Sequence, residues 1–315
     1  MYDEILRIID AHDHIVIHRH KNPDLDALGA QVGLKQLIEN NFTNKTVKIV
    51  GDENYSRFLA RMDDVEDAFY ENALAIVVDV AVKALVADGR YAKAKTTMVI
   101  DHHRNETDFA DYFYSYPDHI ATCQVLGDMA MQHKLVVSPD TATALMAGII
   151  TDSGRFLYPT TSETTFAVAA FLMQNGADLP FLYERLYTEN LAMKKLKGYF
   201  INHFKTTKNS VAYMKNDREL KGRFNVDTFT ISRGMVNQMS GIERIPMWAN
   251  FTEEEDGGIV CELRSKAISI VDIAKKYGGG GHDLACGCTV EDWETTDRIL
   301  NDLDARIVQG GTKHG

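Results

Sequence analysis

The sequence has few of the features that mark secreted, membrane-spanning or zinc-stabilised proteins. Cysteine occurs only 4 times in 315 residues, and the one close pair, Cys286 and Cys288, lacks the two-residue gap and the second pair of a zinc ribbon. No apolar run approaches the roughly 20 residues that a membrane-spanning helix needs, and acids stand near the N-terminus where a signal peptide has basic residues. We therefore expect free thiols, no membrane association and a cytoplasmic protein.

Positive charge is also scarce. The chain has 34 Lys and Arg residues against 45 Asp and Glu residues, which gives a formal net charge of -11. This balance argues against a broad cationic surface, and therefore against stable binding to long nucleic acids or to anionic membranes. It is compatible with a local basic pocket that binds a small anionic substrate.

The first half of the chain contains a regular alternation of strand and helix patterns. Short apolar stretches predict strands at 15–18, 46–50, 74–79 and 97–101, and apolar residues at helical spacing predict helices at 28–38, 121–133 and 140–150. Alternation of this kind predicts an α/β fold with a doubly wound, mainly parallel sheet.

The pattern changes after an amphipathic stretch at 190–204. A strand at 210–214, a helix at 232–240, an antiparallel strand pair at 246–252 and 258–264, and a helix that ends at Gly278 predict a smaller mixed α/β domain. We therefore expect a larger domain at 1–190, a helical linker at 191–207 and a smaller domain at 208–315.

Acidic side chains stand at or beyond the ends of several apolar stretches, among them Asp79, Asp101 and Asp152. Parallel strands bring such ends to one edge of a sheet, where carboxylates in a shared cavity repel one another. Two divalent ions, with a formal charge of +4, would offset the charge of four carboxylates. A carboxylate-rich site with a few imidazoles suits manganese, magnesium or cobalt, and two such ions can activate a water molecule to hydrolyse phosphate esters.

The loop from His20 to Asp26 is the first candidate for this site. In an extended loop Asp24 and Asp26 point to the same side, so both carboxylates can face one cavity. The same residues could instead form a solvated turn that caps a helix beginning at Ala27. The acids and imidazoles farther along the chain favour the interpretation as a metal site. We expect Asp152-Ser-Gly to form a loop next to that site.

Five short motifs together resemble those of the DHH phosphoesterase superfamily. In chain order they are HKNPDLD at 20–26, VD at 78–79, DHH at 101–103, TDSG at 151–154 and, as in a DHHA1 domain, GGGHDLACG at 279–287. The resemblance implies a DHH catalytic domain at 1–190 and a DHHA1 substrate-binding domain at 208–315, with the active site in the cleft between them.

By position, the resemblance also implies a centre of two divalent ions, foremost Mn²⁺, with Mg²⁺ or Co²⁺ as alternatives. The implied ligands are His20 and Asp24 for one ion, Asp26, His102 and Asp152 for the other, and Asp79 as a bridge between them.

Three residues around these ligands have other expected roles. His103 would face the substrate phosphate or the attacking water, and Asp101 would orient the imidazoles. His18 competes with His20 as a metal ligand. We favour a structural role for His18 because it ends the apolar strand.

The second domain would supply the positive charge that the metal site lacks. The implied contacts to a substrate phosphate are Arg264, Ser265, Lys266, Gly279, Gly280, Gly281 and His282, with Arg104 as a further candidate just beyond the DHH motif. Glycines let backbone N–H groups approach a phosphate closely. Without the resemblance, the glycine run would be explained more simply as a helix stop and a flexible turn.

Within the superfamily the chain most resembles the bifunctional oligoribonuclease and pAp phosphatase type, where pAp is 3′-phosphoadenosine 5′-phosphate. This implies hydrolysis of short RNAs to mononucleotides and of pAp to AMP, with short RNA oligonucleotides, pAp or pApA as substrates. A stand-alone phosphodiesterase that acts on cyclic di-AMP or pApA is the nearest alternative, and a non-catalytic nucleotide-binding protein is another. A homodimer is compatible with the sequence.

Overall fold

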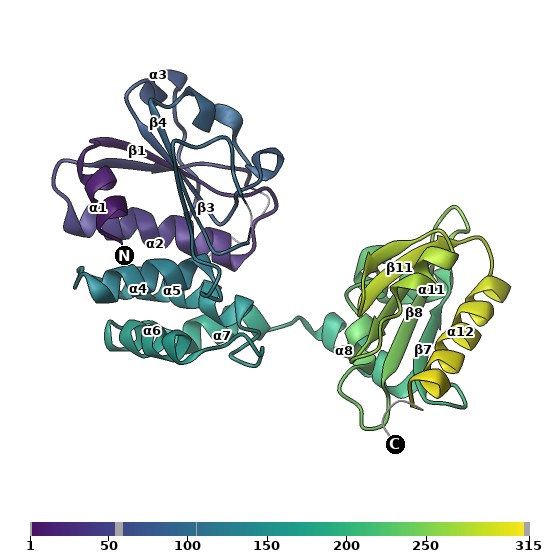
Figure 1. Cartoon of the computed structure of the whole chain (residues 1–315). Coiled ribbons are helices and arrows are strands. Elements are labelled where there is room, and N and C mark those ends of the chain that lie inside the picture. The colour runs from purple at the N-terminus through teal and green to yellow at the C-terminus, as the bar shows by residue number, and fades with distance from the viewer. Residues whose placement is uncertain (1, 54–58, 105, 312–315) are drawn as a thin grey trace. The chain divides into compact units, whose positions relative to one another are not determined.

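The chain forms two compact units, Met1–Thr188 and Glu189–Gly315 (Figure 1). The computed structural model describes residues 2–53, 59–104 and 106–311. Each unit has its own sheet and its own buried clusters of apolar side chains, so each is described by itself. Every helix in the described part of the chain is too short or too polar to cross a lipid bilayer.

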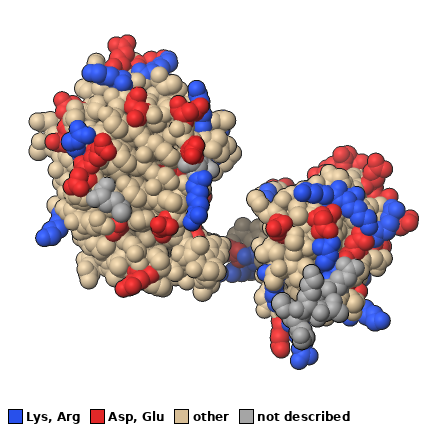
Figure 2. Space-filling model, in the orientation of Figure 1, with Lys and Arg blue, Asp and Glu red and all other residues tan. Residues whose placement is uncertain are grey.

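The visible surface of both units carries mixed charge. Figure 2 shows acidic and basic side chains interspersed among larger areas of other residues. On that face the described Lys and Arg residues do not form one continuous area. All four cysteines are buried free thiols, as predicted.

The first unit is built on a five-stranded sheet in the order β2-β1-β3-β4-β5, with every neighbouring pair parallel. The strands are β1 (His14–His18), β2 (Thr46–Ile49), β3 (Leu74–Val78), β4 (Thr96–Asp101) and β5 (Tyr112–Ser115). Strand β3 is buried along its whole length, as expected for a parallel strand covered on both faces. The predicted α/β fold with a parallel sheet is therefore confirmed.

Strand β5 lies outside the predicted strands. It is a half-buried strand of four residues at the sheet edge, and although three of them are aromatic, the stretch is short and does not alternate between apolar and polar residues.

The strand order reverses at β1, which lies between β2 and β3. The chain therefore crosses to one side of β1 to form β2 and returns to the other side to form β3. In open parallel sheets the connections at such a point leave toward opposite faces, and a crevice opens at the carboxyl ends of the two strands. A ligand site is expected beyond the ends of β1 and β3.

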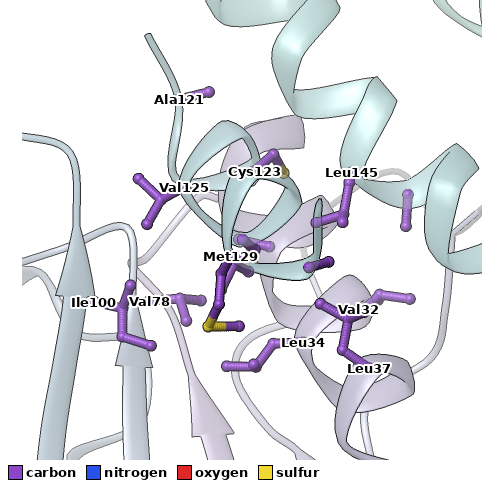
Figure 3. Packing of buried hydrophobic residues seen from close by; sticks show 14 of the residues in the cluster. Val32, Leu34, Leu37, Val78, Ile100, Ala121, Cys123, Val125, Met129 and Leu145 are labelled. Carbon is purple, nitrogen blue, oxygen red and sulfur yellow. The ribbon is translucent and has the colours of Figure 1, made fainter. Parts of the chain in front are cut away.

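One face of this sheet is covered by the helices α1 (Asp3–Asp10), α2 (Leu25–Asn41), α4 (Thr122–Gln132) and α5 (Pro139–Asp152). Figure 3 shows Val78 and Ile100 of the sheet beside Met129 of α4 and Leu34 of α2. Helices α6 (Glu163–Gln174) and α7 (Leu179–Tyr187) pack farther from the sheet, against α5. Gly29 lets α2 approach α5 closely, because a Cβ there would lie 2.3 Å from the carbonyl oxygen of Ala144.

Helix α5 corrects one prediction. Ser138 caps its start and Pro139 occupies its first turn, as the sequence indicates. The helix continues to Asp152, so this acid lies on the last turn of a helix and not in a loop.

Short elements cover the other face of the sheet. They are α3 (Asp67–Tyr70) and the 3₁₀ turns η1 (Lys83–Leu85) and η2 (Gly89–Lys93). Tyr91 and Val86 pack there against Val77 and Val99 of the sheet. In the described residues this face has no helix as long as α2, so its cover is thin.

The second unit contains a six-stranded sheet in the order β10-β11-β9-β8-β7-β6. The strands are β6 (Lys205–Thr206), β7 (Val211–Asn216), β8 (Met247–Glu253), β9 (Ile259–Ser265), β10 (Gly280–His282) and β11 (Ala285–Val290). Strands β7 and β8 are parallel and the other neighbours are antiparallel. The predicted mixed α/β architecture and the antiparallel β8–β9 pair are confirmed.

The helices of the second unit are α8 (Leu191–His203), α9 (Arg218–Phe224), α10 (Thr228–Ser232), α11 (Val271–Lys276) and α12 (Trp293–Gly311), with a 3₁₀ turn η3 (Val236–Met239). Leu196 and Phe200 of α8 are buried in a core of this unit. The single helix expected at 232–240 is wrong: α10 ends at Ser232 and η3 begins at Val236. Gly234 lies between them.

The glycine run also differs from a flexible turn. Gly280 and Gly281 form strand β10 with His282, paired with β11 at the edge of the sheet. The N–H of Gly279 donates to the carbonyl oxygen of Ala274, which ends α11. The four glycines therefore link a helix end to an edge strand.

Candidate functional site

The candidate residues of the first unit gather where its strands end. His20 lies two residues beyond β1, Asp79 directly follows β3, and Asp101 is the last residue of β4. Asp79 has a φ of 59°, a left-handed conformation that is uncommon for residues other than glycine. The chain therefore turns sharply after β3, and the Asp79 side chain stays buried at the carboxyl end of this strand.

Three overlapping groups of side chains have ligand atoms within 4.8 Å of one another. The groups are His20, Asp24 and Asp79; Asp79, His102 and His103; and Asp26, His102 and Asp152. Asp79 and His102 each belong to two groups. The structure thus brings together the six residues that the motifs suggest as ligands, together with His103.

His102 is oriented as a metal ligand would be. Its Nδ1 lies 3.3 Å from the carbonyl oxygen of His119, an acceptor that favours the proton on Nδ1. Its buried Nε2 has no hydrogen-bond partner among the described residues, yet three carboxylate oxygens lie 3.6–3.8 Å away, on Asp26, Asp79 and Asp152. These atoms are too far apart to bond one another and close enough to share a cation, so the donor set fits a divalent ion.

His20 makes the corresponding approach from the other side. Its Nε2 lies 3.5 Å from Oδ2 of Asp79 and 3.8 Å from Oδ1 of Asp24. Asp24 also caps α2, because the same Oδ1 accepts the N–H groups of Asp26 and Ala27 at 3.0 Å. The helix cap and the metal-site geometry, which stood as alternatives, are both present at this residue.

Asp26 is held by a partner that the motifs do not indicate. Its two oxygens accept the backbone N–H groups of Thr122 and Cys123 at 2.7 and 2.8 Å, at the start of α4. The hydroxyl of Thr122 donates to Oδ1 of Asp79 at 3.1 Å. Thr122 therefore positions two candidate ligands. The predicted helix at 121–133 indicated a helix start here, but the sequence carries no sign of which carboxylates meet it.

Crowding of these carboxylates disturbs their protonation. Burial raises the pKa of Asp79 well above its usual range, and the neighbouring Asp26 adds to this. Burial, with Asp26 and Asp24 nearby, raises the pKa of Asp152 to about 8. Burial alone would lower the pKa of His20, but its contacts with Asp24 and Asp79 prevail and raise it to about 10. Binding of a divalent cation to such a group of side chains would release these protons.

His103 is also hydrogen-bonded to Asp101, which belongs to none of the three groups. Oδ1 of Asp101 is hydrogen-bonded to Nδ1 of His103 at 2.8 Å and accepts the backbone N–H groups of His102 and His103. Although burial opposes it, these contacts with His103 lower the pKa of Asp101. The hydrogen bond to Asp101 raises the pKa of His103. His103 is half exposed and presents its other ring nitrogen away from Asp101.

His18 lies apart from these groups. Its ring is fully buried and packs beside Tyr70 and Tyr91. Neither ring nitrogen has a hydrogen-bond partner among the described residues. Burial lowers the pKa of His18 to about 4. Successive strand positions face opposite sides, so the ring occupies the core under the thin cover of the sheet.

A cavity of about 310 Å³ opens beside the groups. Its lining includes His20, Asp24, Asp79, His103 and Asp152. Arg104 is exposed and belongs neither to these groups nor to the residues that line the cavity.

Most side chains that were expected to contact a phosphate from the second unit are hydrogen-bonded within that unit. Arg264 donates to Oε2 of Glu262 at 2.8 Å, and Nζ of Lys266 donates to the carbonyl oxygen of Ile242 at 2.8 Å. Ser265 is buried, and its Oγ accepts the N–H of Ile268. His282 is exposed on β10.

Similarity to known proteins extends over both units. Residues 14–149 match the model of the DHH family, N-terminal domain, and residues 203–309 match that of the DHHA1 domain. The probable bifunctional oligoribonuclease and PAP phosphatase NrnA of Streptococcus mutans is 37% identical over 303 residues, which are 96% of this chain and 97% of that protein. The bifunctional oligoribonuclease and PAP phosphatase NrnA of Bacillus subtilis is 33% identical over 308 residues, which are 96% of this chain and 98% of that protein.

The fold is also found among solved structures. The crystal structure of an exopolyphosphatase-related protein from Bacteroides fragilis covers 97% of this chain and 96% of its own, with a TM-score of 0.77 at 22% identity. Together with the two family models and the relatives over nearly full length, this similarity shows that the chain belongs to the DHH phosphoesterase family, with a DHHA1 domain in its second half.

Proposed function

We propose that the chain is a metal-dependent phosphoesterase that hydrolyses short oligoribonucleotides to mononucleotides and pAp to AMP. The names of the relatives with 33–37% identity over nearly the full chain support these substrates. The geometry that carries the proposal is at Asp79, whose Oδ2 lies 3.5 Å from His20 and whose Oδ1 lies 3.6 Å from His102. One carboxylate thus stands between two groups of ligands.

Two divalent cations, which we propose to be Mn²⁺ with Mg²⁺ or Co²⁺ as alternatives, fit this arrangement. His20 and Asp24 would hold one, and Asp26, His102 and Asp152 the other, with Asp79 shared between them. When bound, such ions polarise a phosphate and activate a water molecule for attack. Asp101 holds the His103 ring through the hydrogen bond to its Nδ1, so that the other ring nitrogen can donate to a phosphate oxygen when the imidazole is protonated.

We further propose that the second unit binds the distal part of the substrate. His282 is exposed on an edge strand, where half of the backbone N–H groups face outward. Arg264, Ser265, Lys266 and the glycines 279–281 would assist it, and Arg104 would do so from the first unit. We also propose a catalytic domain at 1–190, a helical linker at 191–207 and a substrate-binding domain at 208–315. A cytoplasmic location and a homodimer are part of the same proposal.

A substrate panel tests the reaction. With Mn²⁺, Mg²⁺ and Co²⁺ in turn, we expect release of AMP from pAp and of mononucleotides from RNAs of 2 to about 5 nucleotides, with turnover falling for longer RNA because few basic contacts are available. The cyclic-di-AMP phosphodiesterase GdpP of Geobacillus thermodenitrificans matches at 27% identity over 44% of its length, so cyclic di-AMP and pApA are included. Turnover of cyclic di-AMP alone would contradict the proposal.

The bridge is tested by Asp79→Asn, which keeps the side-chain shape and tolerates the left-handed backbone. Loss of a residue that only supports a metal ligand lowers activity by up to about 100-fold. We expect turnover of pAp to fall by more than this, because Asp79 is itself a proposed ligand. Asp140→Asn is the matched control, because Asp140 is exposed at the opposite end of α5 from Asp152. Equal turnover by the Asp79 variant and the wild type would refute the two-ion scheme.

A further inference from the structure

The cavity beside the candidate metal ligands has an apolar side that the proposed chemistry does not use. Val80, Ala81, Val82 and Leu85 form it and are called the apolar wall. Val80 and Ala81 are buried, whereas Val82 and Leu85 are 41% and 52% exposed. Large apolar side chains exposed at the wall of a cavity favour a ligand with an apolar surface of its own.

Backbone hydrogen bonds fix the apolar wall relative to His20. The N–H of Lys21 donates to the carbonyl oxygen of Leu85 at 2.8 Å, and the N–H of Ala87 donates to that of Arg19 at 2.9 Å. His20 and Val86 form an antiparallel bridge between these two bonds. These bonds set the distance of the wall from the candidate ligands.

Lys21 lies at the edge of the same cavity. Its Nζ donates to the carbonyl oxygen of Ala84 at 2.9 Å, which holds the ammonium beside the wall. Within the described ranges no carboxylate forms an ion pair with it. A lysine ammonium has three N–H donors, so two remain for an anion.

The cavity is small. Its volume of about 310 Å³ is at the lower end of the range of small-molecule sites. A site of this size suits one nucleotide unit better than a longer stretch of RNA.

We propose that the apolar wall is a nucleoside-binding subsite. The base of the terminal nucleotide packs against Val82 and Leu85, and Lys21 binds a phosphate of the same nucleotide. Apolar packing does not distinguish the hydrogen-bonding edges of the bases, so the subsite accepts any base. This inference rests on the proposed function, since it assigns the substrate unit that lies beside the metal ligands.

Binding of AMP and of ribose 5-phosphate to the Mn²⁺-loaded protein tests the subsite, because the two probes share a phosphate and differ in the base. Leu85→Ala should weaken AMP by about 5-fold and leave ribose 5-phosphate unchanged, since it removes part of an apolar contact. Lys21→Gln should weaken both probes equally, by about 10-fold. Val136→Ala, which truncates an exposed apolar side chain in the segment that precedes α5, is the control and should change neither.

Equilibrium dialysis of the two probes, alongside turnover of pAp, separates the outcomes. A Leu85 variant that weakens both probes equally, or neither, while wild-type protein turns over pAp, would overturn the subsite and leave the proposed function standing. Wild-type protein that neither turns over pAp nor binds AMP would overturn the proposed function and the subsite with it.

Discussion

At the scale of single residues, the site depends on residues that lie outside every recognised motif. Thr122 holds Asp26 through its backbone and Asp79 through its hydroxyl. His119 contributes only its carbonyl oxygen, yet it sets the direction of the His102 ring. Outer partners of this kind orient ligands and tune their basicity.

Replacement of Thr122 by valine removes the hydroxyl and keeps the shape and the N–H group that Asp26 accepts. We expect the affinity for Mn²⁺ to fall by about 10- to 100-fold, because Asp79 loses a donor that fixes its Oδ1. Free Mn²⁺ measured by electron paramagnetic resonance reports this affinity directly. Thr122→Ser should retain most of the binding, and a valine variant that binds Mn²⁺ as well as the wild type would contradict the role.

His18 makes stability depend on pH. Its pKa is about 4 in the folded chain because of burial, against about 6.5 in an unfolded chain. Between these values the unfolded state binds more protons, so the free energy of unfolding decreases as the pH falls, by on the order of 2 kcal/mol at pH 5.

His18→Leu should therefore lose less stability than the wild type between pH 7.5 and pH 5. Urea unfolding at several pH values measures the difference. His14→Gln, which changes an exposed histidine of the same strand, is the control. Parallel pH curves for wild type and His18→Leu would show that the ring does not carry this dependence.

The residues of the site divide by how far sequence predicts them. The motifs indicated every side chain of the three ligand groups, because their order and spacing are specific. They did not indicate Thr122 or His119. Any residue has a backbone carbonyl group, and a hydroxyl at a helix start is common, so neither contact requires a distinctive residue in the sequence. Nor did they show that Asp24 both caps a helix and faces His20.

At the scale of elements, the strands with continuous apolar runs were predicted well. Strands β1, β3 and β4 and the antiparallel pair β8–β9 follow their apolar residues closely. Strand β5 and the broken helix at 232–240 were not predicted correctly. The aromatic residues of β5 favour a strand, but the stretch is only four residues long and half-buried at a sheet edge, and the predicted helix is interrupted around Gly234.

The glycine run gives a prediction at this scale. A Cβ on Gly279 would lie 2.0 Å from the carbonyl oxygen of Gly287, whereas a Cβ on Gly280 would meet nothing within 4 Å. We expect Gly279→Ala to destabilise the second unit by about 2 kcal/mol or more, since the strands must move apart. Gly280→Ala should stay within about 0.5 kcal/mol of the wild type.

Urea unfolding followed by tryptophan fluorescence compares the two variants. Equal stabilities would show that the packing of Gly279 against β11 is not rigid. Because Gly280→Ala is expected to preserve the fold, its effect on pAp binding reports on the proposed phosphate contact without interference from misfolding.

At the scale of the whole molecule, the two units have separate cores and unequal chemistry. The three candidate ligand groups lie in the first unit, and both tryptophans, Trp248 and Trp293, lie in the second. Tryptophan fluorescence therefore follows unfolding of the second unit alone.

Mn²⁺ should stabilise the first unit selectively. At 100 times its dissociation constant it adds about 2.7 kcal/mol, which corresponds to a rise in Tm of roughly 5–10 °C for a unit of this size. We expect circular dichroism to show this shift and tryptophan fluorescence to show none. Equal shifts with both probes would contradict an assignment of all metal ligands to the first unit, and Asp79→Asn should reduce the shift seen by circular dichroism.

The left-handed backbone of Asp79 has a consequence for how this position changes over generations. A conformation that glycine or asparagine adopts more easily costs an aspartate of order 1 kcal/mol of folding stability. The hydrogen bond from the Thr122 hydroxyl offsets part of that cost, and on the proposed function selection for catalysis opposes it as well. In a gene copy released from such selection, replacement of Asp79 by glycine would relieve the backbone cost as it removed activity, so we expect this position to change early.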